Sequence, residues 1–136
     1  MVKALLFDFY GVLNEDTDPN KALLGFIKTD LKPKYKLAIV SNAADVFMYE
    51  IVPQKALKEL FDEIIVSYQV GYQKPDPRIF NLATEKLKVS AQETIFIDDS
   101  KSYCLAAEQM GMRSICYQGF EEFKKELGSL LSAPNN

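Results

Sequence analysis

The chain has 136 residues, of which 48% are hydrophobic and 26% charged, and its formal net charge at pH 7 is −3. This balance is typical of a globular protein, and a chain of this length can close a core without disulfides or a structural metal. The sequence argues against nucleic-acid binding because it has no basic cluster, and against a membrane helix because no apolar run approaches ~20 residues. Histidine is absent, which excludes catalytic triads and metal sites built on that residue.

Short apolar runs alternate with amphipathic stripes along the chain. The runs are apolar throughout, which is typical of strands covered on both faces, and the stripes have helical spacing. In chain order, we predict a strand over 4–7, a helix over 23–31, a strand over 37–40, a helix over 56–61, a strand over 64–66, a helix over 79–87, a strand over 94–97, a helix over 106–110, a strand over 114–117 and a helix over 120–130.

This alternation predicts an α/β fold, a three-layer sandwich with a mostly parallel five-stranded sheet. Asp76-Pro77 gives the third helix a cap-plus-proline start, and Gly111 ends the fourth. We expect one domain over residues 1–131 and a frayed tail over residues 132–136.

Polar side chains follow the strands at their carboxyl ends, where parallel α/β sheets bind ligands. The set comprises Asp8 after the first strand, Ser41 and Asn42 after the second, Lys74 after the third, and Asp98 and Asp99 after the fourth. Carboxylates suit a divalent metal, while a lysine and a hydroxyl suit phosphate oxygens. The adjacent acids repel each other, so a bound cation explains their pairing best.

Four stretches resemble, in order, the motifs of the haloacid dehalogenase (HAD) superfamily: LLFDFYGVL, IVSN, the lysine of GYQKPDPRIF, and IFIDDS. AAEQMGM resembles the helix that follows the fourth motif, and the likeness covers roughly residues 3–117. The resemblance is to subfamily IA motifs without a cap domain. It implies a Rossmann-like (HAD-like) sheet and a hydrolase.

Carried over by position, the resemblance implies that Asp8 is the nucleophile of an aspartyl-phosphate mechanism. Mg²⁺ would be held by Asp8, the backbone carbonyl of Tyr10, Asp98 and Asp99, the last directly or through water.

The same resemblance implies a phosphate-binding set. Ser41 and the backbone N–H of Asn42 would hold the phosphoryl oxygens, while Lys74 would neutralise charge on the nucleophile and the phosphate.

Tyr10 departs from the family pattern, because most phosphatases of the family carry an aspartate there as general acid and base. A phenol with a pKa of about 10 can donate a proton at neutral pH but is a poor base. We therefore expect a slow Mg²⁺-dependent phosphatase. The alternative is a catalytically impaired module that binds phosphate and metal.

Tyrosine at this position also resembles the 2-haloacid dehalogenase branch, which needs no metal. That branch lacks a full acidic pair in the fourth motif, whereas Asp98 and Asp99 are both present here. It also closes over its substrate with a helical cap. The segment between Gly11 and Lys36 has room for a turn and one helix only.

A site without a cap is open, so we expect a phosphorylated small molecule or macromolecule as partner, or a second copy of the chain that completes the site. Glu15, Asp16 and Asp18 near the mouth would repel polyanions. Tyr103 is a further departure, since relatives commonly carry an asparagine there that orders the acidic loop. Cys104 and Cys116 lack metal-type spacing, and with no signal peptide visible they predict reduced thiols in the cytoplasm.

Overall fold

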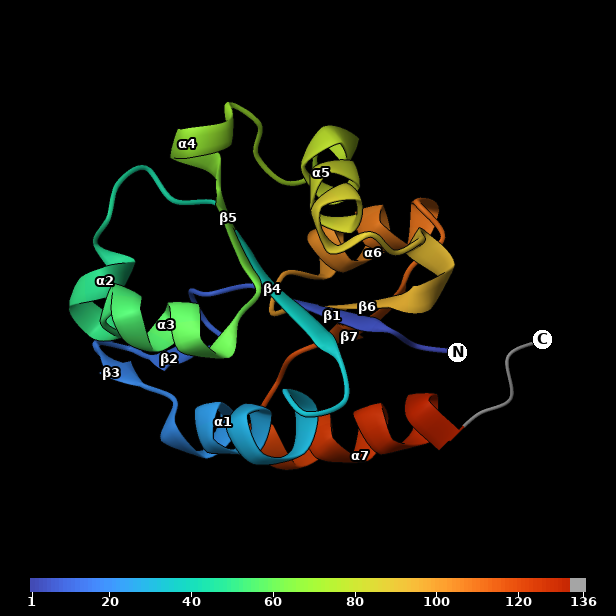
Figure 1. The fold of residues 1–136 in the computed structure, drawn as a ribbon, viewed down its shortest axis with the longest axis horizontal. Helices are drawn as coiled ribbons and strands as arrows, with labels where there is room; N and C mark the ends of the chain where they lie inside the picture. Colours follow the sequence, from blue (N-terminus) through green and yellow to red (C-terminus); the bar gives the residue numbers. More distant parts are fainter. Residues whose placement is uncertain (133–136) are drawn as a thin grey trace.

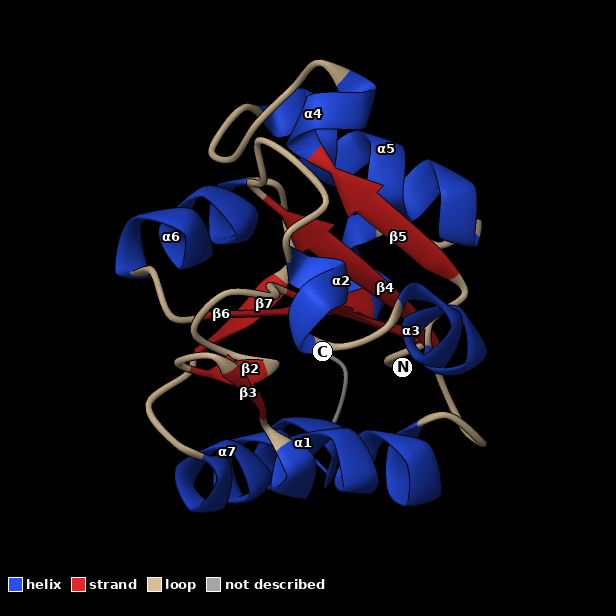
Figure 2. Ribbon diagram, turned by 90° about the vertical axis from the view of Figure 1, so that its left-hand side faces the viewer, coloured by secondary structure: helices blue, strands red, loops and turns tan. Residues whose placement is uncertain are grey.

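A five-stranded sheet forms the middle of the molecule in the computed structural model, which describes residues 1–132. Its strand order is β5-β4-β1-β6-β7, and every neighbouring pair is parallel. Figure 2 shows β5 and β4 side by side, running in the same direction. The strands are β1 (Ala4–Phe7), β4 (Lys36–Ser41), β5 (Glu63–Val66), β6 (Thr94–Asp98) and β7 (Arg113–Cys116). The five predicted strands are confirmed to within one residue at each end.

Helices cover both faces of this sheet (Figure 1). On one face lie α1 (Lys21–Phe26), which continues as a π-helical turn over Ile27–Leu31, and α7 (Phe120–Ser132). On the other lie α5 (Pro77–Leu87) and α6 (Lys101–Gln109). Next to β5 lies α3 (Gln54–Leu60), packed on the same core layer as α1. The predicted α/β three-layer architecture is therefore confirmed.

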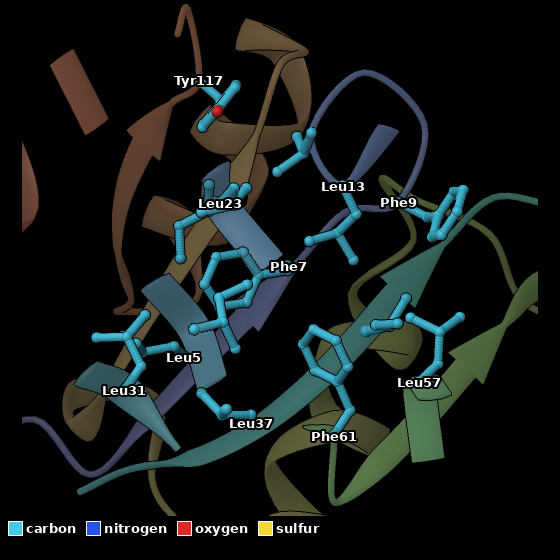
Figure 3. Close-up of a cluster of buried hydrophobic side chains, with 14 of the residues drawn as sticks. Leu5, Phe7, Phe9, Leu13, Leu23, Leu31, Leu37, Leu57, Phe61 and Tyr117 are labelled. Carbon is cyan, nitrogen blue, oxygen red and sulfur yellow. The ribbon is translucent and has the colours of Figure 1, made fainter. Parts of the chain in front are cut away.

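The core consists of two apolar layers because successive strand residues point to opposite faces. Leu5 and Phe7 of β1 belong to the layer under α1 and α7, while Ala4 and Leu6 belong to the layer under α5 and α6. Figure 3 shows the first layer, where the ring centroid of Phe7 lies 6.0 Å from that of Phe61 in an edge-on contact. With both faces buried, the strands expose only their ends to ligands.

The segment between β1 and β4 contains a two-stranded hairpin, α1 and its π-helical turn, and no cap domain. The hairpin pairs β2 (Asn14–Glu15) with β3 (Asp18–Pro19). The sequence analysis missed it, as it missed the one-turn helices α2 (Met48–Ile51) and α4 (Ser67–Val70) and the 3₁₀ turn Ala91–Glu93, because elements this short leave no periodicity.

The C-terminal helix α7 ends at Ser132. The rest of the predicted tail, residues 133–136, lies outside the described residues. Within residues 1–132, no helix is both long enough and apolar enough to cross a bilayer.

Candidate active site

Strand order brings the predicted site residues to one edge of the sheet. The central strand β1 lies between β4 and β6, so Asp8, Ser41 and Asp98 stand at three adjacent strand ends. The backbone N–H of Asp8 continues the ladder by donating to the carbonyl of Ile97 at 2.9 Å. The sheet itself thus fixes where the Asp8 backbone lies.

Lys74 reaches this edge from the loop before α5. Its Nζ lies 2.9 Å from Oδ1 of Asp8 and 2.6 Å from Oδ2 of Asp98. The Lys74 and Asp98 side chains are each 1% exposed and that of Asp8 is 10% exposed, so water screens these ion pairs little. A buried ammonium therefore bridges two buried carboxylates.

Asn42 anchors the backbone of Lys74 rather than reaching a ligand with its side chain. Its Oδ1 accepts from the Lys74 backbone N–H at 2.7 Å, and its Nδ2 donates to the Lys74 carbonyl at 3.0 Å. The same Nδ2 lies 3.3 Å from the hydroxyl of Tyr103. The Asn42 amide therefore holds the Lys74 loop to the end of β4, while a role for its backbone N–H at phosphate stays a prediction.

Asp99 joins the other two acids in a compact carboxylate cluster. One oxygen each from Asp8, Asp98 and Asp99 lies within 4.8 Å of the others. Burial is the main cause that raises the pKa of Asp8 to about 7; Lys74 opposes this rise, and the charge of Asp98 adds to it. Burial and the neighbouring Asp98 also raise the pKa of Asp99.

Ser41 is fully buried at the end of β4, and its Oγ has no hydrogen-bond partner among the described residues. A buried hydroxyl without a partner costs about 1–3 kcal/mol, so such groups usually have a reason. A ligand oxygen at this strand end would satisfy it.

Gly11 leaves room for the Asp99 carboxylate. Its φ is +87°, a conformation that favours glycine, and a Cβ at this position would collide with Oδ2 of Asp99. Gly11 and Asp99 line a cavity of about 480 Å³ together with Glu15 and Asp16. The turn after β1 is therefore shaped around an acidic opening.

The Tyr10 side chain is half-buried, and its ring contacts that of Phe9, with centroids 5.2 Å apart. Burial raises the pKa of Tyr10, as does the charge of Asp45, and a backbone hydrogen bond at Met48 acts in the opposite direction. The groups that act on the phenol thus come from the segment after β4. Within residues 1–132 no hydrogen bond joins it to Asp8.

The donors in this cluster fit Mg²⁺. They are carboxylate oxygens, the hard ligands that this ion prefers. The cluster has three carboxylates and one ammonium, which pairs with two of them, so two negative charges stay uncompensated if all three ionise. A divalent cation would balance that excess.

The structure thus brings four of the predicted site residues into direct contact or close grouping: Asp8, Lys74, Asp98 and Asp99. Ser41 lies at the adjacent strand end, and the Asn42 side chain hydrogen-bonds to the backbone of Lys74. The supporting roles of Asn42 and Tyr103 were not predicted, because each depends on a contact between residues far apart in the chain.

Comparison with known proteins identifies a family. Residues 26–117 match the profile of a family described as haloacid dehalogenase-like hydrolase. A D-ribitol-5-phosphate phosphatase of Bacteroides thetaiotaomicron is 27% identical over 109 residues, which are 76% of this chain and 53% of that protein. The chain spans between 7% and 53% of the length of four curated relatives that it matches.

Two solved structures show the same fold at low identity. A HAD-like family hydrolase of Porphyromonas gingivalis has a TM-score of 0.83 at 18% identity, with 98% of this chain and 100% of that chain covered. A HAD family enzyme of Bacteroides thetaiotaomicron in complex with magnesium and inorganic phosphate has a TM-score of 0.76 at 19% identity, with 90% and 99% covered.

Proposed function

The chain belongs to the haloacid dehalogenase-like hydrolases, and from this premise we propose that it is a slow Mg²⁺-dependent phosphohydrolase acting through an aspartyl-phosphate at Asp8. The observation that carries the proposal is the buried ammonium of Lys74 between Asp8 and Asp98, beside the third acid Asp99. This arrangement combines a carboxylate nucleophile, a fixed positive charge and a cation site.

In the first half-reaction, an oxygen of Asp8 attacks the phosphorus of a phosphomonoester. The new bond joins Asp8 to phosphorus, the bond from phosphorus to the leaving oxygen breaks, and that oxygen takes a proton from solvent. The ammonium of Lys74 stabilises the charge on the phosphoryl oxygens, and the Oγ of Ser41 donates to one of them. Mg²⁺, when bound by Asp8, Asp98, Asp99 and the Tyr10 carbonyl, supplies further positive charge.

In the second half-reaction, water attacks the phosphorus, the bond from phosphorus to the Asp8 oxygen breaks, and orthophosphate leaves while the proton of the water passes to solvent and the Asp8 carboxylate is restored. This step needs a base, and Tyr10 is a poor one. Burial and Asp45 raise its pKa further, so the phenol keeps its proton near neutral pH and cannot accept another. Loss of a placed acid–base group typically costs ~10²–10⁴-fold in rate. Hydrolysis of the phospho-enzyme is therefore the slow step.

The identity of Tyr10 also favours a second candidate function, a module that binds metal and phosphate, or is phosphorylated once, without useful turnover. A dehalogenase is less well supported, because Asp98 and Asp99 are both present and group with Asp8 as a metal site would require. The metal-binding module and the phosphatase share one pocket, so they differ only in the rate of the second half-reaction.

We further propose that the substrate is a phosphorylated small molecule, as the name of the D-ribitol-5-phosphate phosphatase suggests for that relative. A phosphorylated macromolecule also fits a site without a cap, and a second copy of the chain could complete that site. The described cysteines are free and Cys104 is buried, which supports a reducing, cytoplasmic location.

The test is phosphate release from an aryl phosphate in Mg²⁺ and in EDTA, with Asp8→Asn as the inactive variant and Glu59→Gln, an exposed acid on α3, as the matched control. We expect turnover in Mg²⁺ for wild type and Glu59→Gln, and none for Asp8→Asn or in EDTA. Equal rates for wild type and Asp8→Asn would rule out the phosphohydrolase. Chelation-insensitive chloride release from a 2-haloacid would instead indicate a dehalogenase.

A further inference from the structure

The ammonium of Lys74 has more donors than the site uses. A lysine carries three N–H donors, and the Asp8 and Asp98 carboxylates accept from Nζ at 2.9 and 2.6 Å. No third hydrogen-bond acceptor for Nζ occurs in the described part of the chain. One donor therefore remains for another partner.

Two aromatic rings lie close to the ammonium. Nζ lies 5.2 Å from the ring centroid of Tyr103 and 5.5 Å from that of Phe96. These distances are in the range of cation–π attraction, which strengthens when the ion is desolvated, as Lys74 is here. The two rings thus take the place that water would have around an exposed lysine.

Tyr103 is connected to both ends of Lys74. Its ring faces the ammonium, and its hydroxyl lies 3.3 Å from Nδ2 of Asn42, which also binds the Lys74 carbonyl. Phe96 contributes a ring only and lies in the buried strand β6. Tyr103 comes from α6, whose first turn is capped by the Ser100 side chain just after the acidic pair.

We infer that Tyr103 is a positioning residue that keeps the Lys74 ammonium dry, directed at Asp8 and Asp98, and ready to donate its third N–H to a phosphoryl oxygen. A ring attracts an ammonium more weakly than an anionic oxygen does. An arriving phosphate can therefore accept from the third N–H of Lys74 with little loss of free energy. The kinetic part of this inference rests on the proposed phosphohydrolase function, and the structural part does not.

The test compares Tyr103→Leu, which removes the ring, with Tyr103→Phe, which keeps the ring and removes the hydroxyl. Tyr35→Leu is the matched control, because Tyr35 is a half-buried tyrosine just before β4, at the opposite edge of the sheet. The first measurement needs no substrate: NMR of the Lys74 side chain in the free protein. Protons held over aromatic faces are shifted upfield, and a buried ammonium exchanges slowly with water.

We expect Tyr103→Leu to move the Lys74 side-chain signals downfield and to speed ammonium exchange, while Tyr103→Phe and Tyr35→Leu leave both close to wild type. The second measurement is calorimetry with Mg²⁺ and then with inorganic phosphate. Tyr103→Leu should weaken phosphate binding about tenfold, because the Lys74 ammonium is then hydrated and less well ordered and must be desolvated and ordered when phosphate binds, and should leave Mg²⁺ affinity within about twofold.

Unchanged Lys74 signals and phosphate affinity in Tyr103→Leu would overturn the inference. So would an equal loss of Mg²⁺ and phosphate affinity, because that pattern reports a disordered acidic cluster rather than a misplaced lysine. If no variant and no wild-type protein hydrolyses an aryl phosphate while the NMR and phosphate results hold, the phosphohydrolase proposal fails and the role of Tyr103 stands. The measurements therefore distinguish a failed role for Tyr103, a disordered acidic cluster and a failed phosphohydrolase proposal.

Discussion

The Nζ atom of Lys74 lies 0.3 Å closer to Asp98 than to Asp8, at 2.6 against 2.9 Å. Both carboxylates are buried, and neither has another ammonium within 4 Å in the described residues. The lysine thus satisfies the proposed nucleophile and a proposed metal ligand at once. Its removal should affect stability as well as catalysis.

Lys74→Met tests the stabilising role. Removing one partner of a buried ion pair leaves its partner unpaired, and here two carboxylates lose the same ammonium, so we expect the free energy of unfolding in EDTA to fall by about 3 kcal/mol. Mg²⁺ should restore part of that loss, since it compensates the same carboxylates. Urea denaturation with and without Mg²⁺ measures both effects.

Lys86→Met is the matched control for that variant. Lys86 Nζ lies 3.8 Å from Oε1 of Glu63, but the lysine side chain is 46% exposed. Such a surface pair contributes less than about 1 kcal/mol. If Lys74→Met costs no more than Lys86→Met, the Lys74 bridge does not stabilise the fold.

The pKa of Asp8 predicts how the stability of the metal-free protein changes with pH. Its pKa is about 7 in the folded protein against an ordinary value of 3.8, so between these values the folded state keeps a proton that the unfolded state has lost. The free energy of unfolding must then fall as pH rises through this window and level off above it. The groups around Asp8 that set this shift are Lys74, Asp98 and Asp99.

Asp8→Asn isolates this contribution, because asparagine does not titrate. In EDTA, the free energy of unfolding of wild type minus that of Asp8→Asn should decrease from pH 4 to pH 7. Urea denaturation across this range gives the difference directly. A difference that stays flat or rises with pH would contradict the raised pKa.

Gly11→Ala tests whether the turn after β1 is shaped around Asp99. Gly11 has a φ of +87° and Gly71 a φ of +83°, but a Cβ on Gly71 meets nothing within 4 Å. Both alanine variants should lose about 1–2 kcal/mol of stability to backbone strain. Only Gly11→Ala should also weaken Mg²⁺ binding in calorimetry, because its Cβ displaces the Asp99 carboxylate. Equal Mg²⁺ affinities in the two variants would show that Asp99 is free to move without loss of the ion.

Residues at strand ends were predictable from the sequence, and residues that act through side-chain contacts were not. Asp8, Ser41 and Asp98 each follow an apolar run, and the parallel order of strands brings such positions together. Nothing local to Asn42 indicates that its amide would bind both backbone groups of Lys74, 32 residues away. The contact of Tyr103 with Lys74 was equally hidden, since it depends on how α6 packs.

The sequence contains a helix-capping signal at the start of α6, the serine at position 100. The apolar stripe places Ala106, Ala107 and Met110 on a helix without fixing its start, and α6 begins at Lys101 behind the capping side chain of Ser100. A serine directly after an acidic pair is a helix start as well as a motif residue. Reading it so would have placed Tyr103 on the first turn of the helix, close to the acids.

Tyr10→Asp tests the proposed cause of slow turnover. The phenol cannot act as a base near neutral pH, because burial and Asp45 raise its pKa above the ordinary value of 10.0. In wild type, aryl alcohol should therefore appear in a burst of about one equivalent per protein, followed by slower release of phosphate. An aspartate at position 10 supplies a base and should raise steady-state phosphate release at least about tenfold.

Tyr10→Asn controls for the loss of the ring, since it has the shape of the aspartate and no base. Both variants lose the contact with the Phe9 ring, so any shared change in rate or stability belongs to packing. The effect of the added base is the ratio of the steady-state rate of phosphate release in Tyr10→Asp to that in Tyr10→Asn. A ratio near one, with no burst in wild type, would mean that the first half-reaction limits turnover and that position 10 is not where the rate is lost.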